Sequence, residues 1–133
     1  YCMSVHKSQG SEFEAVVLPL LLLVSLLSMA FTRSVSLEGQ EAVREMERYL
    51  RAGEPEAAQQ ALTALCARWE RVTPWLQGWV CHRDTDAVAE HLRGAQVGLT
   101  LGDETLFFSH TAALAEALEH LHHRDDVTLS NLL

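Results

Sequence analysis

Histidine and acidic side chains form two small groups of the residue types that bind metal ions. In the first group, His82 and Asp86 are four residues apart and would share one face of a helix, with Asp84 between them. Imidazole nitrogen and carboxylate oxygen are both ligands of zinc. The second group lies near the end of the chain and comprises His120, His122 and His123.

A structural interpretation of the same residues competes with metal binding. Asp84 or Asp86 would cap the start of a helix, and histidine near a helix C-terminus interacts favourably with the helix dipole. We favour this interpretation and predict no bound metal ion. His82 and Asp86 stay as the candidate ligands to be tested.

The chain shows no arrangement of a nucleophile and a base. Cys81 and His82 are neighbours, but adjacent residues on a helix point about 100° apart. The cysteines Cys2, Cys66 and Cys81 include no Cys-x-x-Cys pair, so neither a zinc site nor a disulfide framework is indicated. Cys66 lies on an apolar helical stretch and is expected to be a buried thiol, although a Cys66–Cys81 disulfide stays open outside the cytoplasm. We predict no catalytic residues, and the sequence favours a protein that is not an enzyme.

The first residues carry a cluster of polar groups that would suit a nucleotide. Residues 5–13 read Val-His-Lys-Ser-Gln-Gly-Ser-Glu-Phe, and Val-Val-Leu-Pro follows at 16–19. This segment, over about residues 3–19, resembles a motif of RecD-like superfamily 1 DNA helicases, which lies in their C-terminal motor domain beside ATP and single-stranded DNA. A glycine allows close backbone approach, and the polar side chains would bond phosphate or ribose. The resemblance implies nucleotide or DNA contacts for His6, Lys7, Ser8, Gln9, Gly10 and Glu12.

The other parts of such a helicase are missing from the sequence. It contains no G-x-x-x-x-G-K-[ST] phosphate loop, and the phosphates and Mg²⁺ would be held by the first motor domain. Because the chain begins with Tyr1, we expect a fragment, a gene fusion or an error in joining the sequence. ATP is expected as a cofactor only under this helicase-fragment alternative.

The element that follows the motif is an apolar run. Residues 15–32 carry no charged side chain, and five consecutive aliphatic residues follow Pro19. As a helix this run would measure about 27 Å, close to the ~30 Å hydrocarbon core of a bilayer. We expect a transmembrane helix with Pro19 in its first turn. The alternatives are a signal peptide cleaved near Ser28-Met29-Ala30 and a segment buried in a soluble core.

Apolar residues at helical spacing predict that the body of the chain is entirely helical. A helix over 37–52, continuous with the anchor in one variant of this prediction, would end at Gly53, and Pro55 would start the next. Pro74 is expected to kink or interrupt this second helix just before Trp75. The second helix carries a heptad-like seam of Leu62, Leu65, Trp69, Val72, Leu76 and Trp79.

Two further helices complete the predicted antiparallel bundle. One would begin near Asp84 or Asp86 and bury Val88, Leu92, Ala95 and Leu99. The other would run from about Asp103 to His122, and residues 127–133 would dock on the bundle as a short tail. The apolar side of this last helix would carry Phe107, His110, Leu114, Leu118 and Leu121. Trp69, Trp79 and Leu76 are expected to be structural core residues, whereas Trp75 is expected to contact a partner or an interface.

The charge distribution limits the partners of this body. The chain has a net charge of −8, and from residue 37 onward eight Arg stand against 16 Asp and Glu, which gives 8 − 16 = −8. An acidic body is repelled by DNA and by anionic lipid surfaces, so we do not expect it to bind nucleic acid.

Residues 20–133 resemble a bacterial family known as domain of unknown function 4363. The resemblance is carried by Gly53-Glu54-Pro55-Glu56-Ala57-Ala58, Trp69, Trp75-Leu76, His82, Asp84, Asp86, Val88, Leu121-His122 and Leu129-Ser130-Asn131-Leu132. It implies an N-terminal membrane anchor followed by a helical extracytoplasmic body, and it implies no activity.

The sequence therefore predicts an all-α protein with three parts. Residues 1–14 form the helicase-like segment, 15–32 a single transmembrane helix, and 33–133 an antiparallel helical bundle. We predict a membrane-anchored, non-enzymatic module that binds another protein or associates with itself, with its body outside the cytoplasm. The alternative is a fragment of a RecD-like ATP-dependent DNA helicase.

Overall fold

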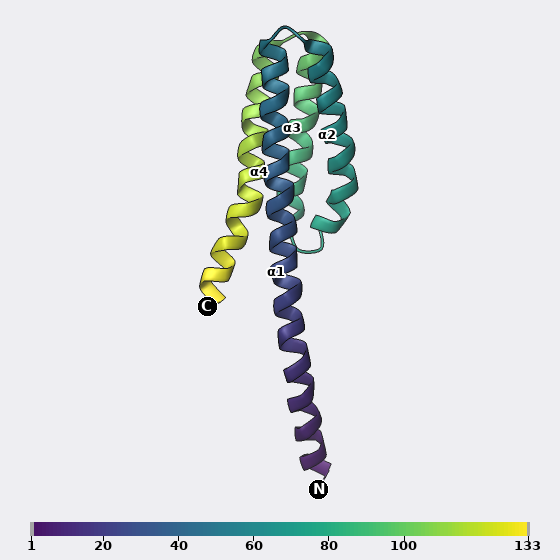
Figure 1. Cartoon of the computed structure of the whole chain (residues 1–133), viewed down its shortest axis with the longest axis vertical. Helices are drawn as coiled ribbons and strands as arrows, with labels where there is room; N and C mark the ends of the chain where they lie inside the picture. Colours follow the sequence, from purple (N-terminus) through teal and green to yellow (C-terminus); the bar gives the residue numbers. More distant parts are fainter. Residues whose placement is uncertain (1, 133) are drawn as a thin grey trace. The chain divides into compact units, whose positions relative to one another are not determined.

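Four helices account for nearly the whole chain in the computed structural model (Figure 1). They are α1 (Cys2–Arg51), α2 (Pro55–Leu76), α3 (His82–Leu101) and α4 (Glu104–Leu132). The structure describes the backbone of residues 2–132 and the side chains of residues 14–121 and 123. Two compact units make up the chain, residues 1–31 and residues 32–133.

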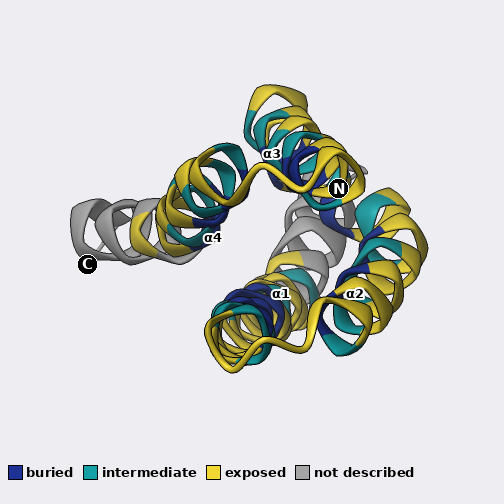
Figure 2. Cartoon of the chain, turned by 90° about the horizontal axis from the view of Figure 1, so that it is seen from above, coloured by how far each residue is buried: buried dark blue, intermediate teal, exposed yellow. Residues whose placement is uncertain are grey.

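The second unit is an antiparallel four-helix bundle, which confirms the predicted all-α fold. The connections over residues 52–54 and 102–103 lie at one end of the bundle, and the connection over 77–81 lies at the other (Figure 1). Seen along the helices, the buried faces of α1, α2, α3 and α4 turn toward a common centre (Figure 2).

All four helices contribute to one hydrophobic core. The largest fully buried side chains are Phe107, Met46, Leu62, Leu76, Leu114 and Leu118. The predicted stripe of α3 is confirmed at Val88, Leu92 and Ala95, whereas Leu99 is partly buried against the cluster. Burying a side chain of this size contributes about 1.5–3 kcal/mol, so these residues supply most of the stability of the bundle.

The first unit differs from the bundle in the exposure of its apolar side chains, although α1 runs through both units. Over residues 14–31 most of the aliphatic side chains are exposed, on every side of the helix, with Leu18 at 64% and Leu27 at 60%. Ser25 donates a hydrogen bond to the carbonyl oxygen of Leu21 at 2.8 Å, so its hydroxyl is satisfied within the helix. The predicted continuity of the anchor with the first body helix is confirmed. The placement of Pro19 in a first turn is wrong, because α1 begins at Cys2 and Pro19 lies in its interior.

The helix ends confirm two predictions of local sequence and correct others. Gly53 has a φ of 79° and ends the turn after α1, and Pro55 occupies the first turn of α2. The predicted capping of α3 by Asp84 or Asp86 is wrong. The N-cap is Cys81, because its carbonyl oxygen accepts the backbone N–H of Asp84 at 3.0 Å and α3 already begins at His82.

Two helices extend further than the sequence indicated. α2 continues past Pro74 to Leu76, although the proline has no N–H to donate to the carbonyl oxygen of Glu70. The predicted end of the fourth helix at His122 is also wrong. α4 continues to Leu132, since no glycine or proline follows Gly102. The predicted docking of the tail concerns side chains outside the described residues.

Trp79 is not part of the core. It lies beyond the end of α2 and is 44% exposed, and Val80 fills the next buried position after Leu76 instead. Trp79 keeps a structural contact, because its indole Nε1 donates a hydrogen bond to Thr32 Oγ1 at 2.9 Å. Trp69 and Leu76 are buried, as predicted.

Candidate functional site

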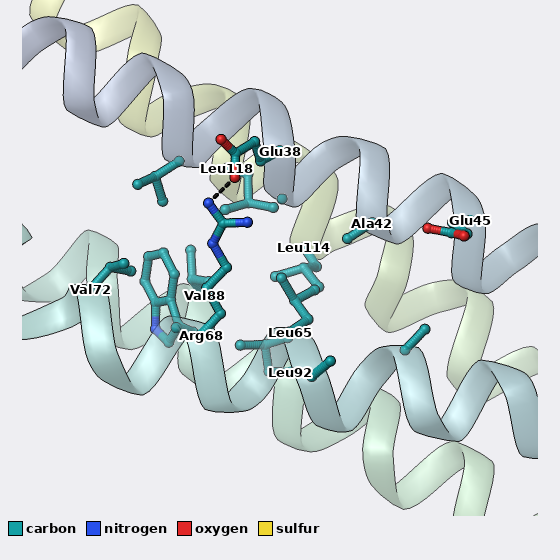
Figure 3. Close-up of a pocket in the computed structure, with 15 residues that line it drawn as sticks. Glu38, Ala42, Glu45, Leu65, Arg68, Val72, Val88, Leu92, Leu114 and Leu118 are labelled. Carbon is teal, nitrogen blue, oxygen red and sulfur yellow. Dashed lines mark ion pairs between the residues drawn. The ribbon is translucent and has the colours of Figure 1, made fainter.

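A cleft of about 220 Å³ opens between α1 and α2 (Figure 3). Four of the residues that line the gap are small and leave it unfilled: Gly39 and Ala42 on α1 and Ala61 and Ala64 on α2. The walls are aliphatic, and α3 and α4 contribute Val88, Leu92, Leu114 and Leu118. An apolar cavity of this kind suits an apolar side chain or a small apolar ligand.

One ion pair bridges the two sides of this cleft. Arg68 on α2 pairs with Glu38 on α1, and the two side chains are 49% and 44% exposed (Figure 3). Glu38 also accepts a hydrogen bond from Ser34 Oγ at 3.0 Å. Exposed pairs contribute about 0–1 kcal/mol, so opening this bridge costs little.

The indole of Trp69 also lines the cleft. Its side chain is buried, with 5% of the residue exposed, and its Nε1–H is a buried donor without a hydrogen-bond partner in the described part of the chain. An unsatisfied buried donor costs about 1–3 kcal/mol. A carbonyl or hydroxyl oxygen that reaches this N–H would recover part of that cost.

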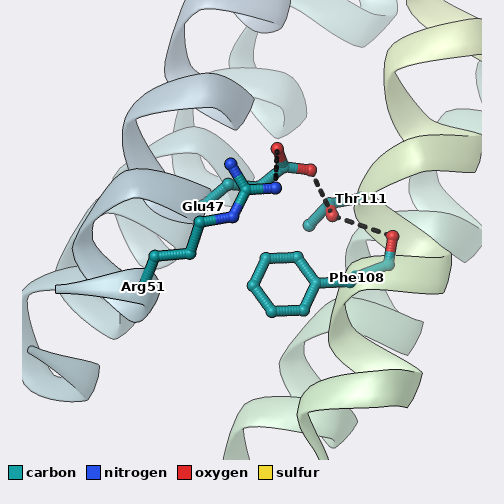
Figure 4. Close-up of polar contacts among 4 residues, drawn as sticks. All are labelled: Glu47, Arg51, Phe108 and Thr111. Atoms are coloured by element: carbon teal, nitrogen blue, oxygen red, sulfur yellow. Dashed lines mark hydrogen bonds and ion pairs between the residues drawn. The ribbon is translucent and has the colours of Figure 1, made fainter. Parts of the chain in front are cut away.

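A polar contact joins α1 to α4 next to the core (Figure 4). Thr111 Oγ1 lies 2.8 Å from Glu47 Oε1 and donates to it, and Arg51 lies 3.9 Å from the other oxygen of the same carboxylate. The guanidinium of Arg51 lies 5.3 Å from the centre of the Phe108 ring. These contacts fix the register of α1 against α4, and they leave no group free to act as a nucleophile.

Two histidines face each other between α3 and α4, and the sequence analysis did not pair them. His91 Nδ1 and His110 Nδ1 are 3.5 Å apart, and both side chains are partly buried. A Cβ at Gly94 would lie 2.3 Å from the His110 ring, so the glycine makes room for it. Pairing these residues needs the relative register of two helices, which no local pattern supplies.

The histidine and acidic groups singled out from the sequence are not brought together. His82 and Asp86 are exposed on α3, and His120 lies 3.8 Å from Glu116 on its own helix. Across the side chains that the structure describes, no three His, Cys, Asp or Glu residues converge on one point. His122 lies outside them.

The cysteines are separate in the fold. Cys66 is partly buried on α2, and Cys81 is exposed at the start of α3; both thiols are free. Burial raises the pKa of the Cys66 thiol, and the negative charge of Glu70 raises it further. A raised pKa keeps this thiol protonated and unreactive, as expected of a structural cysteine.

The residues that the helicase resemblance implies lie on the first turns of α1. His6, Lys7, Ser8, Gln9, Gly10 and Glu12 are in the helical backbone, but their side chains are outside the described residues. Their proposed nucleotide contacts therefore stay a prediction.

Comparison with models of protein families, with curated proteins and with solved structures finds no match to this chain. The two resemblances stated from the sequence therefore stay predictions. The geometry itself offers an apolar cleft, a long exposed apolar helix segment and no assembled catalytic group in the described part.

Proposed function

We propose that this chain is a single-pass, membrane-anchored helical module that binds another protein or a second copy of itself and catalyses no reaction. The observation that carries the proposal is the first half of α1. Near the N-terminus, α1 is long and apolar enough to cross a membrane, and its apolar side chains are exposed rather than packed in a core. A signal sequence meets the same description, so the test must separate the two.

The exposed apolar surface of this segment would be unfavourable in contact with water. Leu20, Leu21, Leu22 and Leu23 are each more than half exposed and point to different sides of the helix. A helix that is apolar all round is stable where lipid or protein covers it. The acidic bundle, in contrast, has the charged surface of a domain that stays in water.

For orientation, we propose that the N-terminus lies in the cytoplasm and the bundle outside it. The resemblance of residues 20–133 to the domain of unknown function 4363 family implies a body outside the cytoplasm. The cysteines offer a direct test, because Cys81 is exposed on the bundle. In intact cells a membrane-impermeant maleimide should label Cys81, and the Cys81→Ser variant should lose that label. Labelling only after lysis would place the bundle inside.

The cleft between α1 and α2 is the surface that we assign to partner binding. Its aliphatic walls suit an apolar side chain. The Glu38–Arg68 pair at its edge offers one negative and one positive group with which a partner can pair. An Ala61→Trp substitution would fill the cleft and should weaken association more than tenfold. Exposed Val97, on the outer face of α3, is the matched site: Val97→Trp should leave association unchanged.

The test of anchoring is to express the whole chain with a C-terminal tag, fractionate the cells and measure the intact mass of the product. Full-length mass in a carbonate-resistant membrane fraction supports the proposal. A soluble product cut near Ala30 means a secreted bundle instead. A soluble and uncut product contradicts both and favours the helicase-fragment alternative.

That alternative has its own measurement. Under it, the full chain should bind ATP or single-stranded DNA at low salt, and deletion of residues 1–14 should abolish the binding. Under the anchored-module proposal the same deletion should leave membrane association and helical content unchanged.

A further inference from the structure

The end of the bundle that holds the α2–α3 connection has an unusual surface. Residues 72–81 contain no charged side chain, in a chain where 21% of residues are charged. Trp75 is 70% exposed and Trp79 is 44% exposed in this segment. Aromatic rings of this size at the surface of an otherwise acidic domain indicate a contact surface.

The residues that follow each tryptophan hold the segment firmly on the bundle. Leu76 and Val80 are buried, and the backbone N–H groups of Trp79 and Val80 both bond to the carbonyl oxygen of Leu76, at 3.0 and 2.7 Å. Because the turn is fixed on both sides, the exposed rings are presented from a rigid support.

One hydrogen bond relates this segment to the membrane-length part of α1. Trp79 Nε1 donates to Thr32 Oγ1 at 2.9 Å, and Thr32 is itself buried. Thr32 directly follows Phe31, which ends the exposed apolar stretch. The hydrogen bond to Thr32 therefore puts the α2–α3 turn beside the residue at which a membrane span would end.

Tryptophan is the side chain best suited to that level of a bilayer. Its large apolar ring favours the acyl boundary, and its N–H favours the wet headgroup side, so tryptophan is enriched at both interfaces of membrane proteins. The charges that flank the turn are of both signs and equal in number: Arg33, Arg71 and Arg83 stand against Glu70, Asp84 and Asp86. The rings, rather than net charge, would carry binding to a zwitterionic lipid.

From this arrangement we propose that residues 72–81, the end of α2 together with the α2–α3 connection, form a membrane-interface surface. This surface rests on the lipid headgroups beside the span and inserts Trp75. The inference rests on the proposed anchoring of α1. It adds that the bundle lies directly on the membrane, with one defined end toward the lipid.

The experiment uses the full-length chain in phosphatidylcholine vesicles in which a share of the lipid carries bromine on its acyl chains, which quenches nearby tryptophan. Three proteins are compared: the native chain, Trp75→Phe, and Trp75→Phe with Val97→Trp. Val97 is half exposed, as Trp79 of the turn is. It lies about 22 Å further along α3 than His82, at a rise of about 1.5 Å per residue. All three proteins keep Trp69 in the core and Trp79 at the turn.

We expect the native chain to lose at least twice the fraction of its fluorescence that Trp75→Phe loses. Adding Val97→Trp should not restore the quenching. Equal quenching of the native chain and Trp75→Phe would overturn the inference. So would a blue-shifted, unquenched Trp75, which would indicate burial against a second copy.

Flotation of the same vesicles separates this inference from the anchoring on which it rests. A chain that floats with the vesicles but shows no quenching of Trp75 keeps its anchor and contradicts the interface. A chain that does not float contradicts both.

Discussion

The two halves of α1 differ more than any two helices of the bundle. Over residues 14–31 the helix exposes leucine and valine on every side. Over residues 32–51 one face is buried, with Val35, Ser36, Val43 and Met46 turned to the core, and the opposite face carries Arg and Glu. The helix is continuous, but its side-chain pattern changes near Thr32. Before Thr32 the pattern suits apolar surroundings on every side, and after Thr32 it suits a protein core on one side and water on the other.

A second contrast is between two interfaces of the bundle, which we call the α3–α4 seam and the α1–α2 seam. Between α3 and α4 the helices approach closely, since a Cβ at Gly98 would lie 2.8 Å from the backbone nitrogen of Phe107. Between α1 and α2 small residues leave the cleft open and an exposed ion pair bridges it. The tight seam is suited to stability, and the open seam is suited to binding.

The largest expected effect breaks the contrast within α1. Leu22→Arg places a charge in the middle of the apolar half, which costs about 2.5–3.5 kcal/mol for insertion at the centre of a span. We expect the tagged protein to leave the carbonate-resistant membrane fraction almost completely. Leu101→Arg, at a residue that is 71% exposed on the bundle, is the matched control and should stay in the membrane. Retention of Leu22→Arg would contradict the anchor.

The next prediction compares one apolar residue from each half. Met46 is fully buried, so Met46→Ala should lower the free energy of unfolding of the bundle by about 2–5 kcal/mol. Leu27 is 60% exposed, so Leu27→Ala should leave that free energy unchanged. Urea unfolding of the detergent-solubilised chain, followed by circular dichroism, measures both. Equal losses would mean that the two halves share one core.

The contrast between the seams is tested by two glycines inside helices. At Gly98 a Cβ meets backbone atoms of Phe107, so Gly98→Ala should cost about 1–3 kcal/mol from overpacking. At Gly39 a Cβ would lie 2.8 Å from Leu118 Cδ1, a flexible atom that also lines the cleft and has room to move. Gly39→Ala should therefore be nearly neutral, as the higher helix propensity of alanine offsets the contact. Thermal unfolding of the two variants should rank them in this order.

Local sequence was sufficient for the helices and most of the core. The i, i+4, i+7 spacing of Val88, Leu92 and Ala95 fixes a buried face whatever the partner helix, and Gly53 ends a helix by its own conformational freedom. Trp79 was misassigned because the seam was continued at a spacing of three beyond the end of α2. The buried position there belongs to Val80.

The candidate sites could not be read in the same way. The cleft depends on four small residues from two helices that meet across a gap, and the His91–His110 pair depends on the register of α3 against α4. Neither relation is encoded within one helical turn. The acids and histidines that cluster in sequence, such as His82 and Asp86, are exposed on the surface of α3.

A smaller effect is expected from two serines, one in each half of α1. Ser36 is buried, and its Oγ donates a hydrogen bond across to the carbonyl oxygen of Leu118 at 2.6 Å. Ser36→Ala should cost about 0.5–1.5 kcal/mol of unfolding free energy, the usual net contribution of one such bond. Ser25 bonds only within its own helix, so Ser25→Ala should leave the unfolding midpoint in place. A larger loss at Ser25 would reverse the assignment of the two halves.

The smallest effect concerns the two thiols of the bundle, the partly buried Cys66 on α2 and the exposed Cys81 at the α2–α3 connection. Burial, and then the charge of Glu70, raise the pKa of Cys66, so less of it is thiolate at a given pH. Maleimide should therefore modify Cys66 more slowly than the exposed Cys81, and Glu70→Gln should speed the reaction of Cys66 slightly.

The same raised pKa sets the sign of a pH effect on stability. Because the folded thiol binds its proton more tightly than the unfolded one, the contribution is complete below the unfolded pKa and is lost as pH rises through the folded pKa. Unfolding midpoints should thus fall slightly more between neutral and alkaline pH for the native chain than for Cys66→Ala. Identical pH profiles, together with equal maleimide rates at the two cysteines, would show that the α2 thiol is as open to solvent as the turn.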